Sequence, residues 1–232
     1  MPLRPLDRRS DIHVHREKLP HWRQWGATYF VTSRLADSVP AGVAKQWQGK
    51  RAAWLEERGV ASAEDLSDDD HHAYHREFTA RFHALLDAGH GDCLLARPQC
   101  TAILQTRLIA GHSSGYHLDA WVVMPNHFHA LVEPAQGITL GDIVKKWKGG
   151  SAREINLACG RSGTVWQAEP FDHVVRSMAQ MNHFRRYIAG NPGKARLRGG
   201  FVLGIGADAA LTADAMLEHF GIDRKEKSSP GL

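Results

Sequence analysis

Residues 116–134, YHLDAWVVMPNHFHALVEP, constrain the fold more than any other part of the sequence. The segment holds two runs rich in β-branched, aromatic and other apolar residues, separated by a Pro-Asn pair that favours a tight turn. It therefore predicts two strands with a short connection. Side chains alternate between the two faces of a strand, so His127 and His129 share one face while Phe128 points to the other.

Two imidazoles on one strand face have two interpretations. Neutral imidazoles side by side are good ligands for a divalent ion, and burying them without one requires partners for each donor and acceptor. The alternative is a pair of hydrogen-bonded structural histidines, which an HxH pattern alone favours. A second such pair, His13 and His15, lies in a polar N-terminal arm and is expected to be solvated. A solvated helix face is likewise expected for the charged segment that carries His71, His72, His75 and His83.

The rest of the chain alternates strand and helix patterns around this hairpin. A strand is expected over residues 26–35 and a shorter one near 162–177. The spacing of apolar residues and the capping residues predict helices after Pro40, up to Gly89, within 97–112, after Thr139 and within 211–232. A further helix should stop at Asn191, because Pro192 disfavours helical geometry in the residue before it. This order of elements predicts an α+β fold.

Composition limits the class of protein. With 232 residues, 43% of them hydrophobic and 23% charged, the chain suits one soluble globular domain. No apolar run is long enough to span a membrane, and the first residues lack the apolar core of a signal peptide, so we expect a cytoplasmic protein. The three cysteines show no CxxC spacing and are expected to be reduced. The net charge of +4 proves little, but basic residues gather between positions 145 and 198, as a polyanionic partner would require.

The segment HFRRYIAGNP offers a second set of reactive side chains. Tyr187 and Asn191 are four residues apart and therefore lie on one helical face. Asn191 can supply a carbonyl oxygen as a third metal ligand, and the Tyr187 phenol can attack a phosphate that a divalent ion polarises, which gives a phosphotyrosine. Arg185 and Arg186 adjoin it and can bind phosphate oxygens. The alternative is a tyrosine at the edge of the core and an asparagine that caps a helix before proline.

Three blocks, WVVMPNHFHALVEP, VWQAEPFDHVVRS and YIAGNPGKARL, together resemble the signatures of REP-associated tyrosine transposases, a branch of the HUH single-strand nucleases with one catalytic tyrosine. The likeness runs from about residue 21 to 197. It implies a ferredoxin-like or RRM-like α+β domain, an antiparallel sheet with helices. The helical insertion expected between Pro40 and His112 goes beyond the smallest members of that family. Gly193 stands where family members carry valine or a similar residue, and no proposed role depends on it.

The resemblance also implies a chemistry. His127, His129 and Asn191 would bind Mg²⁺ or Mn²⁺, and Tyr187 would be the nucleophile. The substrate would be single-stranded DNA with a hairpin, such as a repetitive extragenic palindrome, cleaved to a 5′-phosphotyrosine and a free 3′-hydroxyl. A monomer is expected rather than a dimer. Two alternatives stay open: a DNA-binding regulator that has lost cleavage, and a metal phosphoesterase that uses water.

The domain and DNA-contact predictions follow from these blocks. We expect an arm over residues 1–25, the transposase domain over 26–205 with its helical insertion at about 41–112, and a C-terminal helix and tail over 206–232. Basic side chains are expected to follow the DNA backbone and a tryptophan to stack on bases, although a core position suits that ring equally. The predicted DNA-binding residues are Lys145, Lys146, Lys148, Trp166, Gln167, Arg176, Arg185, Arg186 and Lys194.

Overall fold

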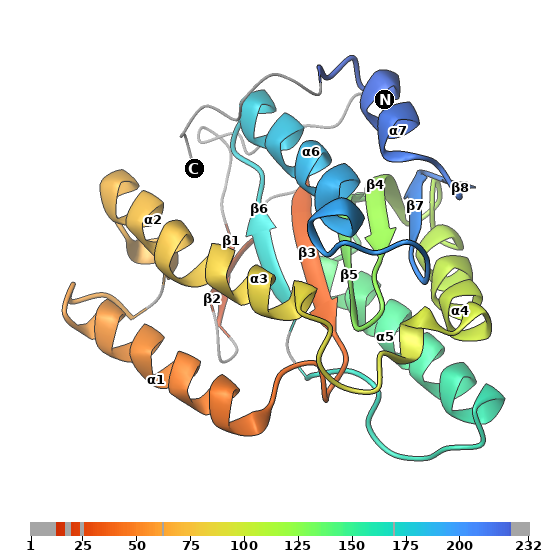
Figure 1. The fold of residues 1–232 in the computed structure, drawn as a ribbon. Helices are drawn as coiled ribbons and strands as arrows, with labels where there is room; N and C mark the ends of the chain where they lie inside the picture. The colour runs from red at the N-terminus through yellow and green to blue at the C-terminus, as the bar shows by residue number, and fades with distance from the viewer. Residues whose placement is uncertain (1–12, 17–19, 24–25, 62, 169, 224–232) are drawn as a thin grey trace.

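A six-stranded antiparallel sheet forms the centre of the part of the chain that the structure describes (Figure 1). The computed structural model describes residues 13–16, 20–23, 26–61, 63–168 and 170–223. The strands lie in the order β6-β3-β5-β4-β7-β8. Their bounds are β3 Tyr29–Arg34, β4 Tyr116–Val123, β5 His127–Pro134, β6 Phe171–Val174, β7 Val202–Ile205 and β8 Asp208–Ala209. The predicted α+β class is confirmed, and so is the hairpin that joins β4 to β5.

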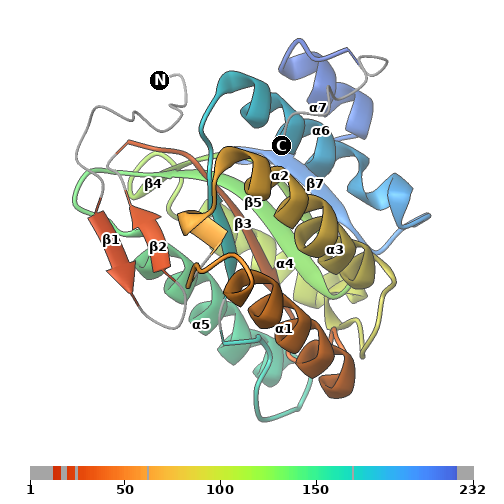
Figure 2. The same cartoon turned by 90° about the vertical axis from the view of Figure 1, so that its left-hand side faces the viewer.

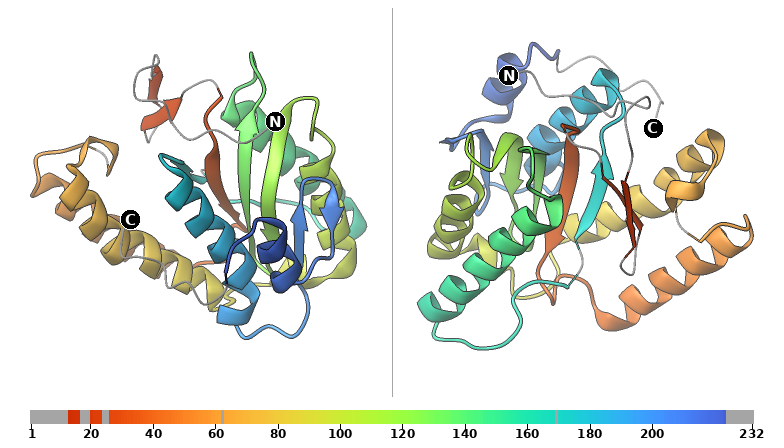
Figure 3. Two further views of the ribbon diagram at one scale, coloured as in Figure 1. Left: turned by 90° about the horizontal axis from the view of Figure 1, so that it is seen from above. Right: turned by 180° about the vertical axis from the view of Figure 1, so that it is seen from behind.

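Four of these strands and two helices follow a ferredoxin-like path. The chain runs β3–α4–β4–β5–α5–β6, with α4 at Pro98–Ile109 and α5 at Leu140–Ala158. The order β6-β3-β5-β4 places the first and third strands of this path side by side, as in the split βαβ arrangement. The right-hand view of Figure 3, from behind, shows α4 and α5 on one face of the sheet, where they contact each other.

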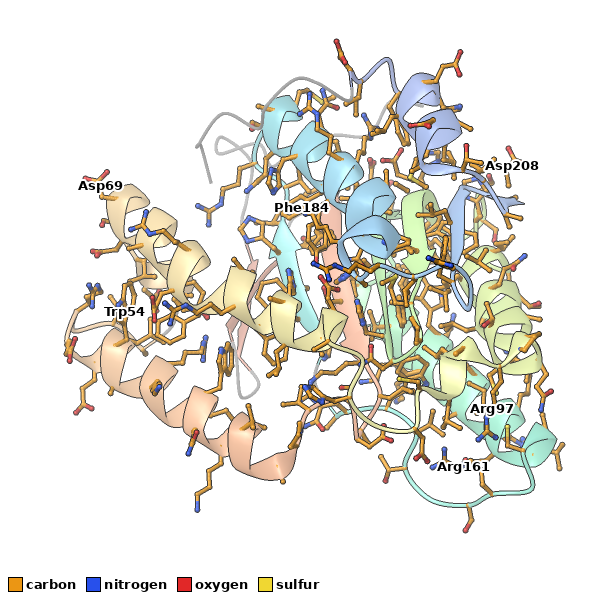
Figure 4. All side chains as sticks on the ribbon, in the orientation of Figure 1. Trp54, Asp69, Arg97, Arg161, Phe184 and Asp208 are labelled. Atoms are coloured by element: carbon orange, nitrogen blue, oxygen red, sulfur yellow. The ribbon has the colours of Figure 1, made fainter. Side chains whose placement is uncertain are left out.

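The opposite face of the sheet carries α6 (Met178–Lys194) and α7 (Ala213–His219) (Figure 1). Strand alternation divides the core accordingly. Phe128 of β5 packs among the side chains beneath α4 and α5, whereas Leu131 packs with the residues of α6. Phe184 projects from α6 toward the sheet, as Figure 4 shows. His127 and His129 alternate with Phe128, so they lie on the α6 face.

The segment between β3 and α4 adds helices beyond the ferredoxin-like path (Figure 2). Its elements are α1 Ala41–Glu56, α2 Asp68–Tyr74, a π-helical turn His75–Thr79 and α3 Ala80–Asp87. Short 3-10 turns lie at Ala63–Asp65 and Leu94–Ala96. Leu55, Leu66, Tyr74 and Phe78 form a small core of their own there. Beyond α3 the chain reverses at Gly89, whose φ of +71° suits glycine after a helix end, as predicted. The domain boundaries themselves remain predictions.

Helix α6 does not stop at Asn191, so that prediction was wrong. It continues through Pro192 to Lys194. A proline in the last turn deprives only the Ile188 carbonyl of its helical donor, and the turn closes through the Ala195 N–H, which donates to the Asn191 carbonyl. Asn191 and Pro192 are both buried, so packing outweighs the local preference.

Strands β7 and β8 were not predicted from the sequence. They lie in the glycine-rich stretch FVLGIGADAA, which lacks the alternation of a half-buried strand. Gly204 pairs with Trp121 of β4, and a Cβ atom at Gly204 would lie 2.2 Å from the indole ring. A large aromatic ring thus fills the place that a side chain of β7 would occupy.

Strands β1 (His13–Arg16) and β2 (Pro20–Arg23) form a separate two-stranded ladder within the predicted arm. The side chains of His13 and His15, and those of the histidines at positions 71, 72 and 75, lie outside the described part of the structure, so their predicted solvation is left as a prediction. Across the described residues, no helix is both long and apolar enough to cross a membrane.

Candidate active site

The two histidines of β5 are fully buried, and each is held by a hydrogen bond to its Nδ1 atom. His127 Nδ1 lies 2.7 Å from Asn126 Oδ1, and His129 Nδ1 lies 2.7 Å from Thr32 Oγ1 on the neighbouring strand. The amide group of Asn126 donates to two backbone carbonyls, so its oxygen accepts and the proton of His127 sits on Nδ1. The Nε2 atom of His127 is therefore a lone-pair donor. Partners of this kind orient imidazole ligands in metal sites.

Both imidazoles are neutral in this environment. Burial lowers the pKa of His127 to about 3, with a further decrease from the neighbouring His83. Burial also lowers the pKa of His129 well below its ordinary value, and His127 and His83 contribute to this decrease. A metal ion binds the neutral form of histidine, so the side chains are in the form that a ligand requires.

Helix α6 brings Tyr187 and Asn191 to these histidines. The Tyr187 Oη atom lies 3.5 Å from His129 Nε2, and Asn191 Nδ2 donates to Tyr187 Oη at 3.2 Å. Asn191 Nδ2 also donates to Asp87 Oδ1 at 3.0 Å. A carboxylate can only accept from this amide, which fixes its orientation. The four residues that sequence reasoning selected, though far apart in the chain, converge in one place.

Two atoms of the site that could donate a lone pair to a metal are buried and have no hydrogen-bond partner among the described residues. They are His127 Nε2 and Asn191 Oδ1. Buried polar atoms are rarely left in this state unless a ligand, ion or water completes them. No group of three or more His, Cys, Asp or Glu side chains that could hold a metal occurs in the described parts of the chain. The donors here include an asparagine oxygen, which suits hard divalent cations.

Helix α3 also borders the site and contacts α6 there. His83 is buried, and its ring centroid lies 5.3 Å from those of His129 and Tyr187. Asp87 Oδ1 lies 3.7 Å from His127 Nε2. The solvated face predicted for His83 was therefore wrong. Sequence reasoning did not consider Asp87 for the site. The signal that could have found both residues was their four-residue spacing, which places two polar side chains on one helical face beside a leucine.

The Tyr187 phenol is largely buried among both aromatic and polar side chains. Its ring meets the Phe30 ring edge-on, with 5.8 Å between centroids, and the Lys194 Nζ atom lies 4.6 Å from the ring centre. Burial raises the pKa of Tyr187 above its ordinary value, and the charge of Asp87 raises it further. The phenol is therefore protonated in this state, and its ionisation requires added positive charge.

The predicted DNA contacts lie on both faces of the sheet. Lys145 and Lys146 are exposed on α5, on the face opposite the Tyr187 site. Lys148 donates to the carbonyls of Gln167 and Ala168, at 2.6 Å each, and so ties their loop to α5. A strand that touches both α5 and α6 would have to pass around an edge of the sheet.

Two of the predicted contacts are engaged inside the protein. Trp166 is buried against Phe128, and its Nε1 atom donates to Ser151 Oγ at 3.0 Å, so its ring has a core position. The Arg185 guanidinium forms a two-bond ion pair with the buried Asp119, at 2.8 and 3.1 Å. Its predicted phosphate contact would require this ion pair to open. Arg176 and Arg186 are half-buried, and Arg186 lies on α6, the helix that carries Tyr187.

Comparisons with known proteins point to one family. Residues 103–191, less than half of the chain, match the model of the family described as "Transposase IS200 like". A "REP-associated tyrosine transposase" of Escherichia coli (strain K12) is 29% identical over 79 residues. That match covers 34% of this chain and 46% of the relative, so the chain spans just under half the length of that protein.

A solved structure described as "Structure of the REP associates tyrosine transposase bound to a REP hairpin" aligns with a TM-score of 0.42 and 17% identity, over 77% of this chain and 74% of that chain. The family segment contains the histidine pair, Tyr187 and Asn191, and it excludes the helices before residue 103. Residues 103–191 thus resemble the IS200-like transposases, and the resemblance to REP-associated tyrosine transposases that the sequence blocks predicted is confirmed.

Proposed function

We propose that this chain cuts and rejoins single-stranded, hairpin-forming DNA through a covalent bond between Tyr187 and a 5′-phosphate, with the help of a divalent cation. The observation that carries the proposal is the position of Tyr187 Oη, 3.5 Å from His129 Nε2 and 3.2 Å from Asn191 Nδ2. A phenol beside nitrogen and oxygen donors of this kind is what a metal-assisted tyrosine nucleophile requires.

Mg²⁺ or Mn²⁺ would be held by His127 Nε2, His129 Nε2 and Asn191 Oδ1. Two of these atoms are buried without a partner among the described residues, and both histidines are neutral, which supports this assignment. When bound, the cation supplies a Lewis acid that polarises a phosphate oxygen. The hydrogen bonds of Thr32 and Asn126 keep the two rings turned toward this position.

Tyr187 would perform the covalent step. Its Oη atom attacks phosphorus, a Tyr–O–P bond forms, and the bond between phosphorus and the 3′-oxygen of the preceding nucleotide breaks. The phenol proton balances the leaving oxygen, so the products are a 5′-phosphotyrosine and a 3′-hydroxyl. The energy of the broken bond is kept in the new one, and a second 3′-hydroxyl can reverse the step. The Lys194 ammonium beside the ring would favour the phenolate during attack.

The substrate class rests on the family segment and on the sequence blocks. Transposases that use one tyrosine act on a single strand, and REP elements fold into hairpins, so we assign single-stranded hairpin DNA as the partner. The basic residues exposed on α5 and the arginines of α6 would contact phosphates. A monomer, as expected from the sequence, remains part of this proposal.

Covalent trapping tests the proposal. The full chain is incubated with a pool of labelled single-stranded hairpins and Mn²⁺, then denatured, and a DNA–protein band is expected. The same mixture with EDTA should give none, because the phosphate is then not polarised. Mass spectrometry of the digested adduct should place the nucleotide on Tyr187. If the hairpins bind but no adduct forms with any of them, the protein is a DNA-binding regulator and the proposal is wrong.

Thr32 is expected to support the cation through His129. In Thr32→Val the Nδ1 atom of His129 loses its 2.7 Å partner in a buried position, so the ring is less well oriented. Loss of such a partner weakens metal affinity by about 10–100-fold. Titration of the variant with Mn²⁺, followed by electron paramagnetic resonance of the free ion, measures the change.

Thr101→Val is the matched control for this experiment. Thr101 is also a buried threonine with a hydrogen bond, but it lies on α4, on the other face of the sheet. Its replacement should cost about 1–3 kcal/mol of stability and leave Mn²⁺ affinity unchanged. Equal Mn²⁺ affinity in wild type and Thr32→Val would show that His129 is not a ligand oriented by Thr32.

A further inference from the structure

The inserted helix α3 presents two polar side chains to the Tyr187 site. His83 and Asp87 are four residues apart on one face, and they meet Tyr187 and Asn191, which have the same spacing on α6. Both α3 residues lie outside residues 103–191, the segment that matches the transposase family. Any role that they have in the site is therefore additional to what that segment supplies.

The end of α3 is fixed in place by the same turn that carries the histidines. Asn126 Nδ2 donates to the carbonyls of Leu86 and His90, at 3.1 Å each, and Asn126 Oδ1 accepts from His127. Asn126 is 1% exposed. The residue between these two carbonyls that reaches the site is Asp87, so its position relative to His127 is set by a buried hydrogen-bond network.

We propose that the Asp87 carboxylate belongs to the divalent-cation site, where it orients the Asn191 amide through a hydrogen bond and places negative charge beside His127. Its Oδ1 atom accepts from Asn191 Nδ2 at 3.0 Å and lies 3.7 Å from His127 Nε2. The inference rests on the proposed function, because it assumes a cation between these residues. Asp87 is thus a positioning residue, contributed by helices that the family segment does not contain.

The charge of the donor set supports this role. Two neutral imidazoles and an amide oxygen offer no negative charge to a divalent ion, whereas hard cations such as Mg²⁺ are held mainly through carboxylates. The half-buried Asp87 carboxylate loses part of its hydration, it contacts an amide and a neutral ring, and the Lys194 ammonium attracts it. The loss of hydration outweighs the attraction of Lys194, so a divalent cation beside Asp87 would offset the remaining cost of this charge.

Mn²⁺ binding by the full chain, without DNA, tests the proposal. Asp87→Asn preserves size and can still accept the Asn191 hydrogen bond, and Asp87→Ala removes both charge and acceptor. We expect each variant to bind Mn²⁺ at least about 10-fold more weakly than wild type, as loss of partners that orient ligands usually does. In cation-free buffer the midpoint of thermal unfolding should not fall in Asp87→Asn, because the loss of hydration of the half-buried carboxylate outweighs its attraction to Lys194.

Asp92→Ala serves as the matched control, since it removes one exposed carboxylate from the adjoining loop and changes the net charge equally. It should bind Mn²⁺ like wild type. If wild type binds Mn²⁺ and either Asp87 variant binds within twofold of it, the role of Asp87 is refuted while the proposed function stands. If wild type binds no Mn²⁺, the cation and the role of Asp87 fail together, and the trapping experiment then decides whether a covalent tyrosine survives.

Discussion

Replacing Tyr187 by phenylalanine is expected to abolish the covalent DNA–protein adduct and to slow strand cleavage by at least about a thousandfold. The variant lacks the oxygen that attacks phosphorus under the proposed function. The fold should persist, because the hydrogen bonds of the hydroxyl to described residues are long, at 3.2 and 3.5 Å. Trapping on labelled hairpin DNA measures the adduct, and gel analysis of the freed strands measures cleavage.

Tyr74→Phe is the control for this experiment. Tyr74 is also a buried tyrosine whose hydroxyl is hydrogen-bonded, but it lies in the small core of the inserted helices and contacts Arg51. The variant should form the adduct as wild type does. An adduct that persists in Tyr187→Phe would mean that another residue is the nucleophile. Cleavage that persists without any adduct would show that water attacks, as in a phosphoesterase.

Local spacing explains why the central residues could be selected from the sequence alone. The alternation of a strand places His127 and His129 on one face, and the repeat of a helix places Tyr187 and Asn191 on one face. Both relations hold within a single element and do not depend on packing. The family resemblance then supplied what spacing could not, namely that the two elements meet across about sixty residues of chain.

The contributions of α3 depend on tertiary packing and could not be predicted in this way. The segment around His83 is rich in charge, so its composition indicates a solvated helix. His83 is instead buried because Leu86 packs into the core and Asn126 binds the carbonyls at the helix end. Nothing in the sequence of α3 identifies this partner on a distant turn. The same limit applies to Arg185, whose partner Asp119 lies on another element.

Burial also reversed a strong local preference. A helix normally ends at or before the residue that precedes a proline, and that rule predicted an end at Asn191. The last turn of α6 continues because Asn191 and Pro192 are both buried. The extended helix keeps Asn191 in helical geometry, four residues after Tyr187, and so keeps its amide on the same face as the phenol.

Phe30, whose ring packs against His129 and Tyr187, is expected to be essential for stability as well. Phe30 of β3 is fully buried, and its ring stacks on Phe184 with 4.3 Å between centroids and on His129 with 5.2 Å. Phe30→Ala should lower the free energy of unfolding by about 3–5 kcal/mol, because a large cavity opens between the sheet and α6. Equilibrium urea unfolding, followed by tryptophan fluorescence, measures this loss.

Phe201→Ala distinguishes a specific effect of Phe30 from the loss of any aromatic ring. Phe201 is only half-buried at the edge of the same core cluster, so its removal leaves a site that water can fill and should cost clearly less. Phe30 also supports the rings of His129 and Tyr187, so a residual folded fraction of Phe30→Ala should trap less DNA than Phe201→Ala at equal folded concentration. Equal losses of stability in the two variants would show that α6 is not held to the sheet through Phe30, and the position of Tyr187 would then need another support.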